Sequence, residues 1–184
     1  MKTPIMLTLL MILAACAPWI NAKGSYESPS RNFSIYIPEG WMRLDTDTYL
    51  LVSKEGPFLQ YVLVQDRHLD KPFRHTKKKM KTGMLPQEAA EVVIDEITAD
   101  QSVLDFEILE NVPATIDGQD GFRILFTYTN RDGLKLKTLY YGVLSGGRYF
   151  GIRYTAAKRH YFSKDIEAFG RILNSFRIFN AEPA

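Results

Sequence analysis

The sequence predicts an α+β fold, in which a mainly antiparallel β-sheet is covered by two amphipathic helices. Segments in which apolar and polar residues alternate outnumber those with helical spacing. Turn signals that contain glycine separate the alternating segments of the C-terminal half: Asp117-Gly118, Asp132-Gly133 and Gly146-Gly147. The two segments with helical spacing each have one apolar side, and the face of a sheet can cover such a side.

Three strands are expected in the N-terminal half of the chain, over 33–37, 49–52 and 58–64. The turn Pro38-Glu39-Gly40-Trp41 ends the first of them. Glu55-Gly56-Pro57 predicts a hairpin turn between the other two. The basic segment that follows, from Arg67 to Lys81, lacks periodicity, so we expect a loop.

A helix is expected to begin at Pro86, which suits a first helical turn, and to end near Asp100. Further strands are then predicted over 104–108, 122–128, 134–144 and 149–154. We expect Ser163 to cap a second helix, followed by a short last strand over 176–179. The apolar stripe of this helix consists of Ile166, Phe169, Leu173 and Phe176. Trp41 and Phe176 are expected to be core residues.

The N-terminus predicts export. Lys2 precedes an apolar run from Ile5 to Leu13, far shorter than the ~20 residues of a membrane-spanning helix and typical of a secretory signal. The following Leu13-Ala14-Ala15-Cys16 resembles the lipobox of bacterial prolipoproteins, in which the cysteine is acylated and the leader is cut before it. This resemblance implies a signal peptide over 1–15 and a lipid attached to Cys16. A flexible tether over 16–31 and a single domain over 32–180 would follow.

Acyl chains on Cys16 would hold the protein stably in a lipid bilayer. Ala17 follows the cysteine, and by resemblance to enterobacterial sorting this implies the inner leaflet of the outer membrane, facing the periplasm. An alternative is ordinary cleavage after Ala22, which would give a soluble periplasmic or secreted protein. Cys16 is the only cysteine, so no disulfide framework is expected and the core must supply the stability.

The folded part resembles the PsbP-like group of α/β/α sandwich domains. The residues that carry the resemblance are Phe33 to Trp41, Gly118 and Gly121, Tyr149 to Tyr154, and Phe169 to Ile178. The group includes an extrinsic protein of photosystem II, a yeast Ran-binding import factor and small bacterial envelope proteins. The resemblance implies an accessory or binding role, without a shared catalytic site.

No catalytic motif stands out in the sequence. Asp66, His68 and Asp70 could offer metal ligands, but we expect a solvated strand end there, because no second histidine or cysteine has metal-ligand spacing. Ser145 lacks the pattern around a hydrolase nucleophile and is expected to be a turn serine. We therefore expect no enzymatic activity, no metal and no cofactor. The formal net charge of +2 does not favour nucleic acid as a partner, and export argues against it.

Two surfaces are candidates for binding. The first is aromatic, and we expect it to be core, with a cleft for a small apolar or sugar-like ligand as the alternative. Its members are Tyr140, Tyr141, Tyr149, Phe150, Tyr154, Tyr161 and Phe162. The second is a basic patch, interpreted as a solvated loop or as a contact with anionic lipid or peptidoglycan. It consists of Arg74, Lys77, Lys78, Lys79 and Lys81.

The sequence thus predicts a non-enzymatic binding or accessory module at a bacterial membrane surface, with an envelope protein, anionic lipid or peptidoglycan as partner. The alternative is a carrier or sensor that holds a small ligand between sheet and helix. The oligomeric state and the partner stay open.

Overall fold

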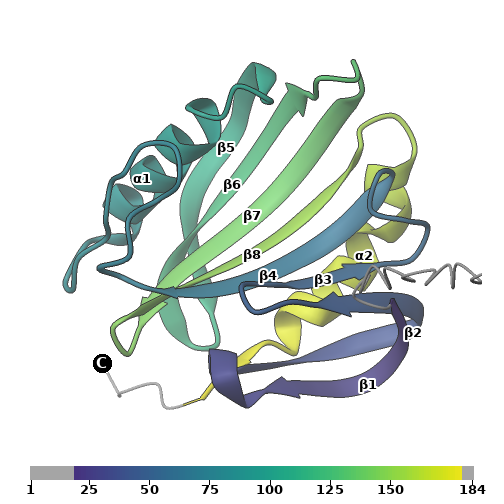
Figure 1. The fold of residues 1–184 in the computed structure, drawn as a ribbon, viewed down its shortest axis with the longest axis horizontal. Helices are drawn as coiled ribbons and strands as arrows, with labels where there is room; N and C mark the ends of the chain where they lie inside the picture. Colours follow the sequence, from purple (N-terminus) through teal and green to yellow (C-terminus); the bar gives the residue numbers. More distant parts are fainter. Residues whose placement is uncertain (1–18, 180–184) are drawn as a thin grey trace, which may run out of the picture.

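The computed structural model describes residues 19–179, which form one nine-stranded antiparallel sheet and two α-helices (Figure 1). The strands are β1 (Ile20–Ser28), β2 (Phe33–Asp45), β3 (Leu50–Ser53), β4 (Gln60–His68), β5 (Leu104–Ile116), β6 (Gln119–Thr129), β7 (Lys135–Ser145), β8 (Arg148–Ala157) and β9 (Arg177–Ile178). The helices are α1 (Pro86–Thr98), α2 (Tyr161–Asn174) and the 3-10 turn η1 (Pro29–Arg31). The predicted signal peptide over 1–15 and the predicted lipid-bearing Cys16 lie outside the described residues.

The strand order is β1-β2-β3-β4-β8-β7-β6-β5, with β9 paired to β2. After β4 the chain leaves the sheet through the basic segment and α1, and it re-enters at the far edge as β5. It then returns strand by strand until β8 lies beside β4. Helix α1 packs on β5, β6 and β7, whereas α2 packs mainly on β8 and β2 (Figure 1).

The alternation of side chains along the strands creates two cores, one on each face of the sheet. The core under α2 includes Phe33, Ile35, Ile37, Trp41, Phe150, Ile152, Tyr154, Phe169, Ile172 and Phe176. The core under α1 includes Ala89, Ala90, Val93, Phe122, Ile124, Phe126, Tyr140 and Tyr149. The sheet is therefore the middle layer of an α/β/α sandwich, and the predicted α+β class is confirmed.

The basic segment between β4 and α1 contains no helix or strand, as expected. It is nevertheless anchored, because Leu69, Phe73 and Met80 are buried in the core under α1. Backbone hydrogen bonds join Phe73 N–H to Lys78 O and Met80 N–H to Leu69 O at 2.8 and 3.1 Å. The segment is thus a fixed cover over one end of β4 and β8.

The two helices match the predicted ranges with one correction. Helix α1 begins at Pro86, and the Glu88 side chain accepts the Leu85 N–H at 2.8 Å, as in a capping box. Ser163 does not cap α2, so this prediction is wrong: the N-cap is His160, one turn earlier. Tyr161 packs against the core and its carbonyl accepts the Tyr154 hydroxyl at 2.7 Å, which favours the earlier start.

Strand β5 is far longer than the predicted 104–108 and is mostly exposed. It is an edge strand, so neighbours cover it less completely than a central strand, and apolar alternation does not translate into burial there. Its pairing with β6 shifts register between Leu104 and Glu107 and again between Ile108 and Glu110. Strand β4 also begins later than predicted, at Gln60, and leaves Phe58 87% exposed.

The predicted flexible tether over 16–31 is wrong for Ile20 to Arg31, which form β1 and η1. Strand β1 pairs with β2 in an antiparallel ladder that aligns Ala22 with Trp41 and Ser28 with Phe33. The domain therefore begins by Ile20 rather than at residue 32.

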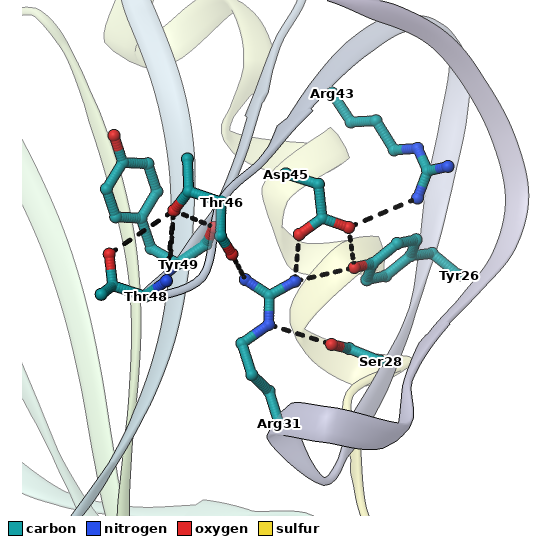
Figure 2. A network of polar contacts seen from close by, with 8 residues as sticks. All are labelled: Tyr26, Ser28, Arg31, Arg43, Asp45, Thr46, Thr48 and Tyr49. Atoms are coloured by element: carbon teal, nitrogen blue, oxygen red, sulfur yellow. Dashed lines mark hydrogen bonds and ion pairs between the residues drawn. The ribbon is translucent and has the colours of Figure 1, made fainter. Parts of the chain in front are cut away.

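A polar network holds this N-terminal segment in place (Figure 2). The Arg31 guanidinium donates hydrogen bonds to Ser28 Oγ at 2.9 Å, to the Tyr26 hydroxyl at 2.8 Å and to Thr46 O at 2.9 Å. Arg31 also forms an ion pair with Asp45, which accepts the Tyr26 hydroxyl as well. The Arg31 side chain is 7% exposed, and each of its nitrogens has a partner.

No helix between residues 19 and 179 has the length and apolar character needed to span a bilayer.

Phe176→Ala is expected to lower the free energy of unfolding by about 3 kcal/mol or more, because it leaves a cavity in a filled core. Phe176 is 0% exposed and packs on Phe33 and Phe150, with ring centroids 5.8 and 6.0 Å away. Trp41→Ala should lower the free energy of unfolding by a similar amount, because Trp41 is only 2% exposed. The matched control is Phe58→Ala, expected to change stability by less than about 0.5 kcal/mol. Urea unfolding measures both, and equal losses would contradict the assigned burial.

Candidate functional site

A cleft of about 570 Å³ opens on the α1 face of the sheet. It exists because α1 covers β5, β6 and β7 but leaves this face of β4 and β8 without a helix. Helix α1 and the segment 73–75 form one wall, and the loops 57–59 and 100–103 lie at its margins. The strands β4, β8, β7 and β6 form the floor.

Strand register sets the floor residues, since aligned residues of neighbouring strands point to the same face. One row across the sheet aligns Tyr61 with Thr155, Thr155 with Thr138, and Thr138 with Phe126. The Thr138 and Thr155 hydroxyls lie 2.9 Å apart and share a hydrogen bond. The next row aligns Arg153 with Tyr140. Polar and aromatic groups from four strands thus meet at one place.

Arg153 is the charged group of the floor. Its guanidinium carbon lies 5.8 Å from the centre of the Tyr61 ring. Its Nε is buried and has no hydrogen-bond partner in the described part of the chain. No carboxylate between residues 19 and 179 forms an ion pair with it.

The tyrosines beside Arg153 are hydrogen-bond donors at neutral pH. The Tyr149 hydroxyl donates to the Tyr140 hydroxyl at 2.8 Å, and Gln65 Nε2 contacts the same oxygen at 3.4 Å. Burial raises the pKa of Tyr140. Burial, together with the neighbouring Tyr61, also raises the pKa of Tyr128. The hydroxyls of Tyr128 and Tyr140 therefore keep their protons.

Three other charged groups of the cleft, Glu96, Asp100 and Arg67, already have partners. Glu96 accepts the N–H groups of His75 and Thr76 at 2.9 Å each; burial opposes its charge, but these bonds lower its pKa overall. Asp100 accepts the N–H and hydroxyl of Ser102 at 2.9 and 2.8 Å. Arg67 donates to two backbone carbonyls of the basic segment, both at 2.7 Å, and lies 4.0 Å from the ring centre of Phe73.

Asp66, His68 and Asp70, weighed in the sequence as a metal site, are not grouped as ligands. Asp66 accepts a hydrogen bond from Arg148 Nε at 2.6 Å, and His68 Nε2 lies 2.8 Å from Arg148 Nη1. Burial raises the pKa of Asp66. The hydrogen bond from Arg148 lowers this pKa but offsets the effect of burial only in part. The expected solvated strand end is wrong for Asp66, whose side chain is 2% exposed. Within residues 19–179 no three ligand-type side chains are grouped to hold a metal ion.

Ser145 lies at the end of β7, directly before the Gly146-Gly147 turn, as expected of a turn serine. Its hydroxyl is buried and has no partner among the described residues.

The aromatic residues divide between core and cleft. Tyr140, Tyr149, Phe150 and Tyr154 are buried, so the expectation of core is confirmed for them. Tyr140 also lines the cleft on the α1 face. The sequence analysis did not single out Arg153, although a charged residue inside the apolar segment 149–154 was a usable signal.

All five residues of the basic patch are exposed on the segment between β4 and α1. Lys78 forms an ion pair with Asp95 of α1, and Lys77 Nζ donates to Arg74 O at 2.7 Å. Arg74 also lines the cleft. The basic segment therefore lies against an acidic helix, which neutralises part of the patch and leaves Lys79 and Lys81 facing solvent.

With the cleft and the sheet established, the molecule is an α/β/α sandwich that carries a cleft with polar and apolar lining on one face. No protein-family model matches the sequence, and no curated protein sequence matches it either. Among solved structures the chain is similar to cyanobacterial PsbP from Synechocystis sp. PCC 6803, with 13% identity and a TM-score of 0.63 over 87% of this chain and 94% of that one.

Two further structures share the fold. The Ran-binding protein Mog1p of Saccharomyces cerevisiae has 11% identity and a TM-score of 0.56 over 85% of this chain and 95% of its own. LpqN, involved in cell envelope biogenesis of Mycobacterium tuberculosis, has 12% identity and a TM-score of 0.55 over 80% and 83%. These likenesses confirm the fold that the sequence resemblance implied, and at such identities they concern the fold alone.

The basic patch is expected to bind anionic membranes weakly. A chain of residues 17–184 should pellet with phosphatidylglycerol vesicles at low salt and be released at high salt, because surface charges are screened over about 8 Å at physiological ionic strength. Changing Lys77, Lys79 and Lys81 to Gln should abolish pelleting, since each basic residue contributes about 1 kcal/mol near such a surface.

The control replaces Lys23, Lys135 and Lys158, which are exposed elsewhere and remove the same charge. Pelleting should persist in this variant. If both triple variants lose binding equally, net charge rather than the patch is responsible.

Proposed function

We propose that this chain is a non-enzymatic binding module of the bacterial cell envelope that holds a small ligand in the cleft between α1 and the sheet. The cleft carries the proposal. Its volume of about 570 Å³ falls within the range typical of ligand sites, roughly 300–1,000 Å³. Its floor joins hydroxyls, an amide and a guanidinium to an apolar wall that includes Val93, Ile97 and Phe126. Such a combination suits a ligand with both polar and apolar parts.

This observation favours the carrier or sensor that the sequence analysis gave as the alternative. A surface-binding module needs no internal cleft, and both cores of the molecule are otherwise filled with apolar side chains. Of the predicted aromatic surface, Tyr140 lines the cleft, and it is joined there by Tyr61 and Tyr128, which were not predicted.

The chemistry of the cleft supports binding rather than catalysis. Its carboxylates, Glu96 and Asp100, are engaged by neighbouring N–H and hydroxyl groups. Its tyrosines Tyr128 and Tyr140 have raised pKa values and stay protonated. A general base needs a pKa near the working pH and a free position beside the substrate. We therefore propose that the protein acts without a chemical step.

The cleft is expected to bind fragments. Residues 17–184, labelled with ¹⁵N, should be titrated with a set of anionic, neutral and cationic aromatic fragments. At least one class should shift the amides of Tyr61, Thr138 and Thr155, whereas the edge strand β5 should stay unshifted. Shifts scattered over the surface, or none at the cleft for any class, would overturn the proposed ligand site.

Anchoring through an acylated Cys16 completes the proposal. Cleavage after Ala22 would remove the part of β1 that pairs Ile20 with Arg43 and Ala22 with Trp41, and this favours the lipobox. Because β1 begins at Ile20, an extended chain from Cys16 reaches at most roughly 14 Å, so the domain would lie close to the membrane. LpqN, involved in envelope biogenesis, offers a parallel for an envelope role of this fold.

Cys16→Ser is expected to abolish lipid labelling and to release the protein from membranes, because the thiol carries the acyl chains. Radiolabelled palmitate and membrane fractionation measure both effects. Outer-membrane fractions should contain the wild-type protein. A wild-type mature chain that begins at Lys23 and carries no lipid would contradict the anchoring, and enrichment in the inner membrane would contradict the outer-membrane assignment alone.

A further inference from the structure

Arg153 occupies an unusual position for an arginine. Strand β8 lies between β4 and β7 near the middle of the sheet, and Arg153 extends from it into the cleft. Arg153 is half-buried, its Nε is buried without a hydrogen-bond partner in the described range 19–179, and no carboxylate of that range pairs with it. The buried Nε–H has lost its hydration without a compensating hydrogen bond.

Two other arginines with mostly buried side chains differ from Arg153 in that each has a carboxylate partner. Arg31 has a partner for each nitrogen, including the ion pair with Asp45. Arg148, on the same strand as Arg153, is paired with Asp66. Arginine stays charged at every physiological pH, so Arg153 cannot avoid the desolvation penalty by losing a proton. A negatively charged partner from outside the described chain would offset this penalty.

The surroundings of Arg153 suit an oxyanion. Tyr61, Tyr128 and Tyr140 line the same cleft, and the hydroxyls of Tyr128 and Tyr140, whose pKa values are raised, are protonated and can donate. Three arginines line the cleft against two carboxylates, and both carboxylates already accept hydrogen bonds: Arg67, Arg74 and Arg153 against Glu96 and Asp100. The guanidinium fork matches the two oxygens of a carboxylate or phosphate.

We propose that the ligand of the cleft is a small organic anion, whose carboxylate or phosphate is bound by Arg153 and whose apolar body lies along Val93, Ile97 and Phe126. This inference rests on the proposed function and names the chemical class of the ligand. It places the charged end over β8 and the apolar end under α1.

The test is an NMR titration of residues 17–184 with benzoate, phenyl phosphate and benzamide, which share the ring and differ in the charged group. Benzoate or phenyl phosphate should shift the amides of Thr138, Tyr140 and Thr155, and benzamide should bind at least about tenfold more weakly, because a charge-assisted bond is lost. Comparison of benzoate with phenyl phosphate identifies which anion the cleft prefers.

Arg153→Met should weaken the binding of the preferred anion by about tenfold or more while leaving benzamide unchanged. It should not lower the melting temperature, because a half-buried charge without a carboxylate partner is replaced by an apolar group of similar length. The control is Arg123→Met: Arg123 pairs with Glu110 outside the cleft, and its loss removes the same charge. This variant should keep the affinity of the wild type.

Equal binding of benzamide and benzoate, or unchanged benzoate binding by Arg153→Met, would overturn the anion proposal and leave the cleft as a site for neutral ligands. A marked loss of stability in Arg153→Met, without loss of anion binding, would assign Arg153 a purely structural role. If none of the three compounds shifts the cleft amides, the anion proposal fails. The wider fragment set then decides separately whether the cleft binds any ligand.

Discussion

The division of side chains between the two faces of strand β8 is the constraint on which the molecule depends. Phe150, Ile152 and Tyr154 enter the core under α2, while Tyr149 and Arg153 point to the α1 face. One central strand therefore supplies both cores and the floor of the cleft. Two helices cannot cover both faces of so wide a sheet, and the uncovered part of the α1 face, over β4 and β8, becomes the cleft.

The fold uses arginine in two opposite ways, one buried and one half-buried. Arg31 ties η1 to Asp45 and Thr46, so that the N-terminal segment becomes part of the domain (Figure 2). That pair is weak evidence for stability in itself, because desolvation offsets much of its attraction, but it fixes where β1 lies. Arg153 has no such partner within residues 19–179. The same residue type thus acts as an internal tie at one place and as an unsatisfied donor at another, and only the second suits a ligand.

Local signals in the sequence gave most of the fold. Pro86, the glycine turns and the period-two segments each act within a few residues, so helix starts, turns and central strands were predictable. The predictions were wrong where contacts between residues far apart in the sequence determine the local structure. The segment Ile20–Arg31 looks like a polar linker until β2 and Asp45 are placed beside it. The candidate site was likewise hidden, because Tyr61 and Arg153 are brought together only by the pairing of β4 with β8, which follows a crossover through α1 and three strands.

The basic segment connects the two candidate surfaces. Its apolar residues Leu69, Phe73 and Met80 are fixed in the core under α1, so its position relative to the cleft is set by packing. Its lysines are exposed on the outside, and Arg74 belongs both to the basic patch and to the lining of the cleft. An anionic surface bound by the patch would therefore lie beside the cleft. Contact with an anionic surface and ligand binding in the cleft would then be neighbouring events, joined by the one segment that contributes to both.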